Sequence, residues 1–197
     1  MNYKKIYNHV DTNGFYTIDN FLPNKIANNL NQKFIECQNW DEISQIRPNH
    51  YKEVMKFDRA FYPSSDEIFY SKFSRSYFLE NQINKVFLKY LKPVVNNIYK
   101  LQSHEIRCHK MDTSCLYRFH IDDYTSKIST TYYLNKSWVW DWGGILHLED
   151  LNNLENIHSI LPKYNRLVIM KQPLNHFVTP VNDFALEPRY TIVTFNE

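Results

Sequence analysis

The sequence predicts an α+β fold in which N-terminal helices support a C-terminal β-sandwich of the jelly-roll type. Amphipathic helical spacing occurs only in the first half of the chain, whereas short β-prone runs separated by turn signals follow one another after about residue 103. The chain has 197 residues, of which 43% are hydrophobic and 22% charged, values typical of one globular domain. We therefore expect a single domain over residues 1–197, with helical support and the first strands in 1–103 and the jelly-roll core in 104–197.

The first elements are predicted from residues 14–22 and 24–36. Residues 14–22 form a short β-prone run bounded by a glycine and a proline, which favours a strand. Residues 24–36 follow Pro23 and carry apolar side chains at four-residue spacing from Ile26 onward. This spacing predicts an amphipathic helix.

The rest of the N-terminal half is predicted to contain loops and two further helices. Residues 40–63 have mixed character and include prolines, so we expect loops with short strands. Residues 65–67 offer an N-cap and an acidic first turn for a short helix. Residues 81–99 place apolar side chains on one side of a longer helix, which we expect to be disturbed at Pro93 because proline lacks a backbone N–H donor.

The C-terminal half has the pattern of a series of strands. Turn signals such as Gly143-Gly144 and Pro188 separate short runs of high β-propensity. These runs are residues 104–111, 128–134, 145–148, 166–170 and 189–195. A succession of strands of this length is typical of a sandwich or barrel.

Composition excludes several classes of function. With only 3 glycines the chain has no Gly-rich phosphate loop, and a net charge of +2 does not favour a nucleic-acid partner. No apolar stretch is long enough to cross a membrane, and the N-terminus lacks the apolar core of a signal peptide. The 3 cysteines form no CxxC pair, which favours a reducing compartment. We therefore expect a cytoplasmic protein that binds neither nucleic acid nor membrane.

Two HxD motifs occur, at His9 and at His120, and their surroundings distinguish them. His9 precedes the first predicted strand and is expected to be a solvated terminal residue. His120 lies between two β-runs, so its segment is predicted to be extended. The period of two in an extended chain places the side chains of His120 and Asp122 on the same face.

A third ligand for a metal at this pair would come from elsewhere in the chain, and His176, which follows the predicted strand 166–170, is the candidate. Two histidines and one carboxylate on one face of an octahedron leave three positions open. This arrangement suits a non-haem Fe(II) that must bind a chelating co-substrate and O2 together. Zinc fits less well, because it prefers a closed tetrahedron or a single open position. The candidate catalytic and metal-binding residues are therefore His120, Asp122 and His176.

A site for a carboxylate is predicted on the last strand. Arg189 opens this strand, and Thr191 shares its face. A buried arginine beside a hydroxyl can bind a distal carboxylate through paired hydrogen bonds. Tyr133, on the strand after the HxD loop, could donate a third hydrogen bond. Taken alone, Arg189 is more readily interpreted as a strand-end residue in a surface ion pair.

Six short motifs follow one another in the C-terminal half. They are HxD at His120, TYYLNxxW from Thr131, WGGxLxL from Trp142, PxxNRLV from Pro162, HxVxPV from His176 and RxT from Arg189. In this order and spacing they resemble the Fe(II)/2-oxoglutarate dioxygenases, and most of all the prolyl-hydroxylase-like branch. The resemblance covers residues 104–196, about half of the chain.

The resemblance implies a double-stranded β-helix, a variant of the jelly roll, with the metal at its open mouth. It implies that His120, Asp122 and His176 are the ligands of Fe(II). The aspartate matters, because halogenases of this superfamily have alanine or glycine at that position. The resemblance therefore favours hydroxylation.

The resemblance also implies the co-substrates and the reaction. Arg189 would bind the distal carboxylate of 2-oxoglutarate, helped by Tyr133 and Thr191. Oxidative decarboxylation of 2-oxoglutarate to succinate and CO2 would be coupled to hydroxylation of an unactivated C–H by O2, with ascorbate as a possible reductant.

Three functions stay open. The first is hydroxylation of a prolyl residue in a peptide or protein. The second keeps the chemistry but replaces the substrate by a free amino acid or another small metabolite. The third is a non-catalytic jelly-roll binding module, against which the complete set of two histidines, one aspartate and one arginine argues. The substrate, the regio- and stereochemistry and the oligomeric state do not follow from the sequence.

The chain departs from the family pattern before the HxD motif. Prolyl hydroxylases often place a tyrosine near the start of the preceding strand, where this chain has His109, and the glycine usual in the next loop is absent. His109 could face the pocket with Arg107 and contact a polar substrate, although a strand-surface role is favoured.

Other conspicuous residues are assigned structural roles. His147 is expected on the outer face of its strand, and Asn165 in a turn. A tryptophan cluster precedes the double glycine, and packing of a loop onto the sheet is favoured over an aromatic wall for the substrate. This cluster consists of Trp138, Trp140 and Trp142.

Overall fold

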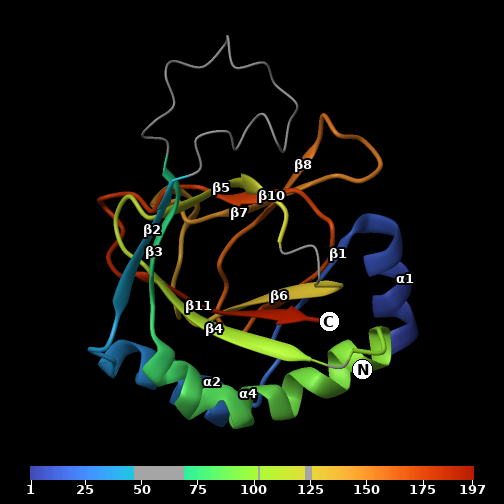
Figure 1. Ribbon diagram of the computed structural model, residues 1–197, viewed down its shortest axis with the longest axis horizontal. Coiled ribbons are helices and arrows are strands. Elements are labelled where there is room, and N and C mark those ends of the chain that lie inside the picture. Colours follow the sequence, from blue (N-terminus) through green and yellow to red (C-terminus); the bar gives the residue numbers. More distant parts are fainter. Residues whose placement is uncertain (47–68, 102, 123–125) are drawn as a thin grey trace.

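The chain folds into a curled antiparallel sheet with helices against one of its faces (Figure 1). The computed structural model describes residues 1–46, 69–101, 103–122 and 126–197. The helices are α1 (Tyr3–Asn13), α2 (Asn24–Glu36), α4 (Tyr77–Ile98) and the short 3-10 helix η2 (Trp140–Trp142). The strands are β1 (Phe15–Ile18), β2 (Asp41–Ile46), β3 (Phe69–Arg75), β4 (His104–Met111), β5 (Leu116–His120), β6 (Ile128–Tyr133), β7 (Leu146–Glu149), β8 (Ile157–Ile160), β9 (Leu167–Lys171), β10 (His176–Val178) and β11 (Arg189–Asn196).

The sheet curls so that two layers face each other. One layer, which we call the major sheet, has the strand order β1-β9-β6-β11-β4. The other, the minor sheet, has the order β5-β10-β7-β8. Strand β3 pairs with both β4 and β5 and joins the two layers, while β2 extends from β3. This arrangement confirms the predicted α+β jelly-roll fold with supporting helices.

The predicted strands of the C-terminal half are all present, as β4, β6, β7, β9 and β11, and their ends differ from the prediction by at most one residue. Strands β5, β8 and β10 are absent from the predicted set of β-prone runs. Within residues 40–63, where loops with short strands are predicted, β2 is such a strand, and its register against β3 shifts between Gln45 and Ile46. The rest of that region and the helix predicted at 65–67 lie outside the described residues.

Helix α2 confirms the prediction, whereas α4 corrects it. Helix α4 begins at Tyr77 rather than at residue 81, because the Ser76 hydroxyl accepts a hydrogen bond from the Leu79 N–H at 3.3 Å and caps the helix. It continues through Pro93 without a break. Since Pro93 is exposed, water can satisfy the carbonyl that lacks its usual donor. Among the described residues, no helix is both long and apolar enough to span a membrane.

Helix α1 is absent from the sequence prediction. The Asn2 side chain accepts a hydrogen bond from the Lys5 N–H at 3.0 Å and begins the helix, and Gly14, with φ of 82°, ends it. Its apolar signal is short, because only Ile6 and Val10 reach the core. Strand β1 follows directly and is shorter than the predicted strand 14–22.

Two hydrophobic cores stabilise the fold. The first lies between the helices and the outer face of the major sheet, and includes Phe34, Phe87 and Ile192. The second lies between the two sheets and includes Met111 and Leu148. The major sheet is therefore covered on both faces, and the candidate site is found beside the second core.

Candidate functional site

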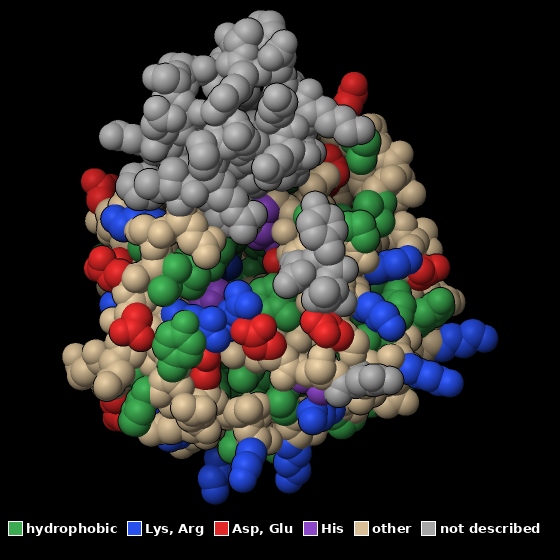
Figure 2. Space-filling model, in the orientation of Figure 1, with side chains coloured by type: hydrophobic (Ala, Val, Ile, Leu, Met, Phe, Trp, Pro, Cys, Tyr) green, Lys and Arg blue, Asp and Glu red, His purple; other side chains and the backbone are tan. Residues whose placement is uncertain are grey.

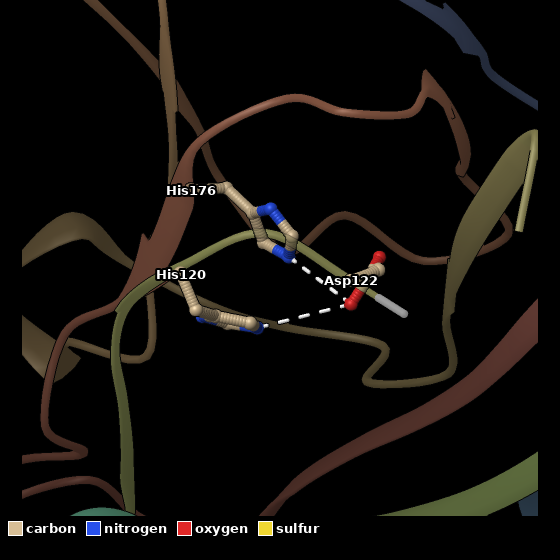
Figure 3. Close-up of side chains that lie close together, drawn as sticks. All are labelled: His120, Asp122 and His176. Carbon is tan, nitrogen blue, oxygen red and sulfur yellow. Dashed lines mark ion pairs between the residues drawn. The ribbon is translucent and has the colours of Figure 1, made fainter. Parts of the chain in front are cut away.

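Three predicted ligands converge at the mouth between the sheets. His120 is the last residue of β5 and His176 the first of β10, and the two lie opposite each other in the antiparallel ladder. Asp122 follows two residues after His120, and its Oδ1 lies 3.8 Å from Nε2 of His120 and 3.6 Å from Nε2 of His176 (Figure 3). One ligand atom from each residue lies within 4.8 Å of the others, a grouping that could hold a metal ion.

Backbone carbonyls orient both imidazoles. Nδ1 of His120 lies 2.5 Å from the Arg118 carbonyl oxygen, and Nδ1 of His176 lies 2.8 Å from that of Leu174. A carbonyl oxygen only accepts hydrogen bonds, so each Nδ1 carries the proton. In the neutral ring the lone pair is then on Nε2, the atom that faces Asp122. Metal-binding histidines are held in this way in many proteins.

The electrostatics favour an ionised carboxylate between the two rings. Burial by itself would raise the pKa of Asp122, but the adjacent imidazoles of His176 and His120 hold this pKa well below its usual range. Burial lowers the pKa of His176, and the Asp122 carboxylate outweighs it, so that the pKa of His176 is raised. Each group thus depends on its neighbours for a compensating charge. A divalent cation at this point would supply that compensation with the ligand types that Fe(II) accepts.

The three residues line a cavity of about 370 Å³ between the sheets. The molecule is hollowed near the centre of the face shown in Figure 2, where histidine and basic side chains are visible. The major sheet supplies most of the other polar residues that line this cavity. They are Arg107, His109, Thr131, Arg189 and Thr191.

Arg189 lies in this cavity without an ionic partner. Its side chain is buried, with the residue only 3% exposed, and burial lowers the pKa of its guanidinium. Nη1 donates to the sulfur of Met111 at 3.2 Å, the guanidinium lies over the Tyr133 ring, and Nε has no hydrogen-bond partner. Among the described residues no carboxylate forms an ion pair with Arg189. Because an uncompensated buried charge is costly, this arrangement favours an anionic ligand.

Two further unpartnered polar atoms lie beside Arg189. Thr191 on β11 is opposite Tyr133 on β6. The hydroxyls of both residues are buried, and neither has a hydrogen-bond partner within the part of the chain that the structure describes. Burial raises the pKa of Tyr133, so its hydroxyl keeps its proton and can donate. Sequence reasoning proposed these three residues as a carboxylate site. The structure brings them together and excludes the alternative of a surface ion pair for Arg189.

Comparison with known proteins agrees with this geometry. Residues 106–196 match the family described as the 2OG-Fe(II) oxygenase superfamily. This part of the chain, which contains all the candidate site residues, belongs to the superfamily. The superfamily and the cluster of two histidines and one aspartate together imply Fe(II) and 2-oxoglutarate for this oxygenase. The comparison with curated protein sequences gives no match.

Solved structures similar to this oxygenase include two prolyl hydroxylases. A prolyl-4-hydroxylase from Pseudomonas putida has a TM-score of 0.68 at 15% identity, covering 99% of this chain and 98% of that one. A prolyl hydroxylase from Trichoplax adhaerens, in complex with a hypoxia inducible factor oxygen degradation domain peptide fragment, has a TM-score of 0.69 at 20% identity, covering 98% and 88%. A 2OG-Fe(II) oxygenase family oxidoreductase from Burkholderia pseudomallei has a TM-score of 0.66 at 11% identity, covering 100% and 91%. At these identities the similarity shows a common fold.

His109 corrects one expectation about the oxygenase. It was expected at the strand surface, but it is buried and lines the cavity, with its ring 4.4 Å from that of Phe73. It lies opposite Thr191 in the ladder between β4 and β11, and its Nε2 has no hydrogen-bond partner. Burial lowers the pKa of His109 far below its usual value, which keeps the ring neutral. His109 therefore offers the cavity an uncharged polar group beside the carboxylate site.

Tyr117 is a cavity residue that sequence reasoning does not detect. Its ring stacks on His120, with centroids 5.6 Å apart. An ideal strand would place residues three apart on opposite faces, but the register of β5 against β10 shifts between Tyr117 and His120. This bulge turns both side chains toward the cavity, and no sequence motif predicts it.

His147 and two of the three clustered tryptophans have the structural roles that were expected of them. His147 is on the outer face of β7 and stacks on Phe177 at 4.6 Å. Trp138 is buried and donates from Nε1 to the Gly143 carbonyl at 2.9 Å, with Trp142 packed edge-on against it, whereas Trp140 is exposed.

Asn165 holds the turn before β9. Its side-chain oxygen accepts hydrogen bonds from the Leu22 N–H at 2.8 Å and the Tyr132 hydroxyl at 2.9 Å, and its amide donates to the Leu22 carbonyl. Its φ of 58° lies in the left-handed region that asparagine tolerates. The expected turn role is therefore confirmed, while His9 lies on α1 with Nδ1 2.9 Å from the Phe15 carbonyl oxygen.

Proposed function

We propose that the chain is an Fe(II)- and 2-oxoglutarate-dependent hydroxylase of an unactivated C–H. The observation that carries the proposal is one cavity with two different anchors, the cluster of His120, Asp122 and His176 and the unpaired Arg189 guanidinium. A binding module has no need of both. A dicarboxylate that chelates a metal with its oxo-acid end requires both anchors within the same cavity.

Each residue has a defined part in this proposal. His120, Asp122 and His176 would hold Fe(II), and Arg189 with Tyr133 and Thr191 would hold the distal carboxylate of 2-oxoglutarate. The bound Fe(II), with 2-oxoglutarate and O2, supplies oxidative decarboxylation to succinate and CO2 and transfer of one oxygen atom to the substrate. Ascorbate would serve as a reductant. The carboxylate of Asp122 completes the ligand set and leaves no vacancy for a halide, which supports hydroxylation.

The polar groups of the cavity would control what the oxygenase accepts. Arg189 fixes the charged end of the co-substrate, so that its other end can point only toward the histidine and aspartate cluster. The apolar lining, including Phe73 and Leu146, excludes water from the surroundings of the reacting C–H.

For the substrate we propose a prolyl residue in a peptide or protein. The support is the fold shared with two prolyl hydroxylases, one of which is bound to a peptide fragment in its solved structure. A free amino acid or another small metabolite is the second candidate, which the modest cavity volume favours. The cysteines Cys37, Cys108 and Cys115 are free thiols, which supports a reducing compartment such as the cytoplasm.

The test is anaerobic addition of Fe(II) followed by 2-oxoglutarate, monitored by the visible charge-transfer band of the chelate. We expect the band in the wild type, its loss in Asp122→Ala and its weakening in Arg189→Ala. A folded wild-type protein without the band contradicts the proposal. Succinate release is then measured with proline-containing peptides and, separately, with free amino acids. Mass spectrometry of the product for one added oxygen atom distinguishes the two substrate classes.

A further inference from the structure

Gln172 connects the two segments that carry the candidate metal ligands. Its Oε1 accepts hydrogen bonds from the Asp122 N–H at 3.3 Å and from the Leu174 N–H at 3.1 Å. Its Nε2 donates to Asp122 Oδ2 at 3.1 Å and to the Ser129 hydroxyl at 2.7 Å. The side-chain amide thus has four partners, which is its full hydrogen-bonding capacity.

These contacts define how the Asp122 carboxylate is presented. Gln172 holds Oδ2 through its amide, while Oδ1 is the oxygen that faces Nε2 of both His120 and His176. The same glutamine holds the Asp122 backbone N–H, so the main chain and the side chain of Asp122 are fixed together. A carboxylate on a short side chain would otherwise rotate, and a fixed one binds a metal at a smaller entropic cost.

The contact with Leu174 extends this control to His176. The Leu174 N–H donates to Gln172, and the Leu174 carbonyl accepts from Nδ1 of His176 at 2.8 Å. Leu174 is therefore held by Gln172 on one side and orients the imidazole of His176 on the other. A displacement of the Gln172 amide would disturb two ligands of the three.

Gln172 is itself anchored to the major sheet. It follows Lys171, the last residue of β9, and its backbone N–H donates to the Lys127 carbonyl at 2.9 Å. Its amide contacts Ser129 on β6, which is fully buried. The side chain thus reaches from the rigid, doubly covered sheet to the loop after β5. Because the Gln172 amide is neutral, it holds Asp122 and leaves the negative charge of the carboxylate available to a metal. A lysine in its place would neutralise that charge.

We propose that Gln172 is a positioning residue that sets the metal affinity of this oxygenase by fixing Asp122 and, through Leu174, His176. This inference rests on the proposed function, because it assumes that the three residues bind a metal. Hydrogen-bonding partners of metal ligands typically change metal affinity by about 10–100-fold when they are removed.

The experiment measures Co(II) binding to the metal-free protein by calorimetry, with the visible Co(II) spectrum as a probe of ligand geometry. Gln172→Met preserves the length of the side chain and removes all four hydrogen bonds. We expect Co(II) affinity to fall about 10–100-fold and the spectrum to change. The control is Gln32→Met on α2, where the exposed amide donates to Glu36, and there we expect wild-type affinity and spectrum.

Thermal melting of the metal-free variants separates positioning from folding. A folded Gln172→Met protein that binds Co(II) with wild-type affinity and spectrum overturns the inference and leaves the proposed function intact. A wild type that binds no Co(II) overturns both. If Gln172→Met does not fold, Ser129→Ala takes its place, since it removes one anchor of the amide. A smaller but measurable loss of affinity then supports the inference, and an unchanged affinity overturns it.

Discussion

His120 and His176 face each other across the ladder between β5 and β10, with ring centroids 4.2 Å apart. Because the two strands are hydrogen-bonded, the position of one imidazole fixes that of the other. Asp122 needs only two further residues of chain to reach the same point. The candidate metal centre is therefore a property of one strand pair, completed by the loop that follows β5.

Asp122→Ala is expected to abolish most metal binding. The substitution leaves two neutral imidazoles without the anionic ligand, so the loss of Co(II) affinity should exceed the roughly 100-fold effect that a hydrogen-bonding partner of a ligand can have. Calorimetric titration of the metal-free protein measures it. The control is Asp150→Ala, which removes the ion-pair partner of the exposed His158 side chain and should leave metal binding unchanged, since neither residue lines the cavity. Equal affinities in the two variants would contradict the assignment of Asp122.

Arg189→Met is expected to weaken 2-oxoglutarate binding and to leave metal binding intact. Loss of charge-assisted hydrogen bonds to a carboxylate costs about 3 kcal/mol, or about 100-fold in affinity. The charge-transfer band, titrated with 2-oxoglutarate, measures this change. Tyr133→Phe removes one neutral donor and should show a smaller loss, of about tenfold. A Tyr133→Phe effect as large as that of Arg189→Met would argue against the guanidinium as the main anchor.

Gly144→Ala is expected to act on the carboxylate site through Arg189. A Cβ at Gly144 would lie 2.8 Å from Cδ of Arg189, and φ is 62°, so the arginine must shift and the backbone is strained. We expect weaker 2-oxoglutarate binding in a folded protein, measured by the same titration. The control is Gly14→Ala, with φ of 82° and close contacts to the flexible side chains of Leu151 and Leu174, which should lower the melting temperature without affecting 2-oxoglutarate.

Gly143→Ala, by comparison, is expected to prevent folding. Its Cβ would lie 2.0 Å from the Pro180 carbonyl oxygen, which belongs to the backbone and cannot move aside. Soluble expression and circular dichroism measure the difference from Gly144→Ala. A well-folded Gly143→Ala protein would show that the close approach of these two segments is not required.

The ion pairs of Asp19 are expected to contribute to stability only above acidic pH. The hydrogen bond from Arg166, assisted by Lys163, lowers the pKa of Asp19 to about 2. This folded-state pKa lies below the unfolded value of about 3.9. The ion pairs therefore contribute their full stabilisation above about pH 3.9, and this stabilisation is lost as the pH falls through about 2. Asp19 is partly exposed, so solvent screening limits the effect to about 1 kcal/mol.

Urea unfolding of Asp19→Asn at two pH values tests this. We expect the free energy of unfolding to fall by about 1 kcal/mol at neutral pH and by much less near pH 2. The control is Asp11→Asn, whose pair with Lys171 is more exposed and should contribute little. A pH-independent difference for Asp19→Asn would contradict the ionic origin.

The long strands of the site could be predicted from the sequence because each is a run of β-prone residues bounded by turn signals. The ladder that joins β11 to β4 and β6 explains why Arg189, Thr191 and Tyr133 meet as predicted. The convergence of the two histidines was also predicted, from the position of His176 directly after the predicted strand 166–170. Their role as ligands stays a prediction.

The features that could not be predicted depend on tertiary packing, that is, on which elements cover each face of a strand. Alternation places His109 and Cys108 on opposite faces of β4, but it does not reveal that helices cover one face and the minor sheet the other. His109 was therefore assigned to the surface although both residues are buried. The bulge in β5 and the side-chain network of Gln172 are equally absent from the pattern, because they depend on the register between strands that are far apart in the chain.

The described α-helices α1, α2 and α4 pack against the major sheet, and none of these three backs β5, β10, β7 or β8 (Figure 1). The two halves of the site should consequently differ in how readily they open. Amide hydrogen exchange in β11 and β6, between two cores, would approach the rate of global unfolding, whereas β5 and β10 would exchange through smaller local openings. Metal binding would slow amide exchange chiefly in β5 and β10. The ion would thus stabilise the minor sheet, which is the less protected of the two layers.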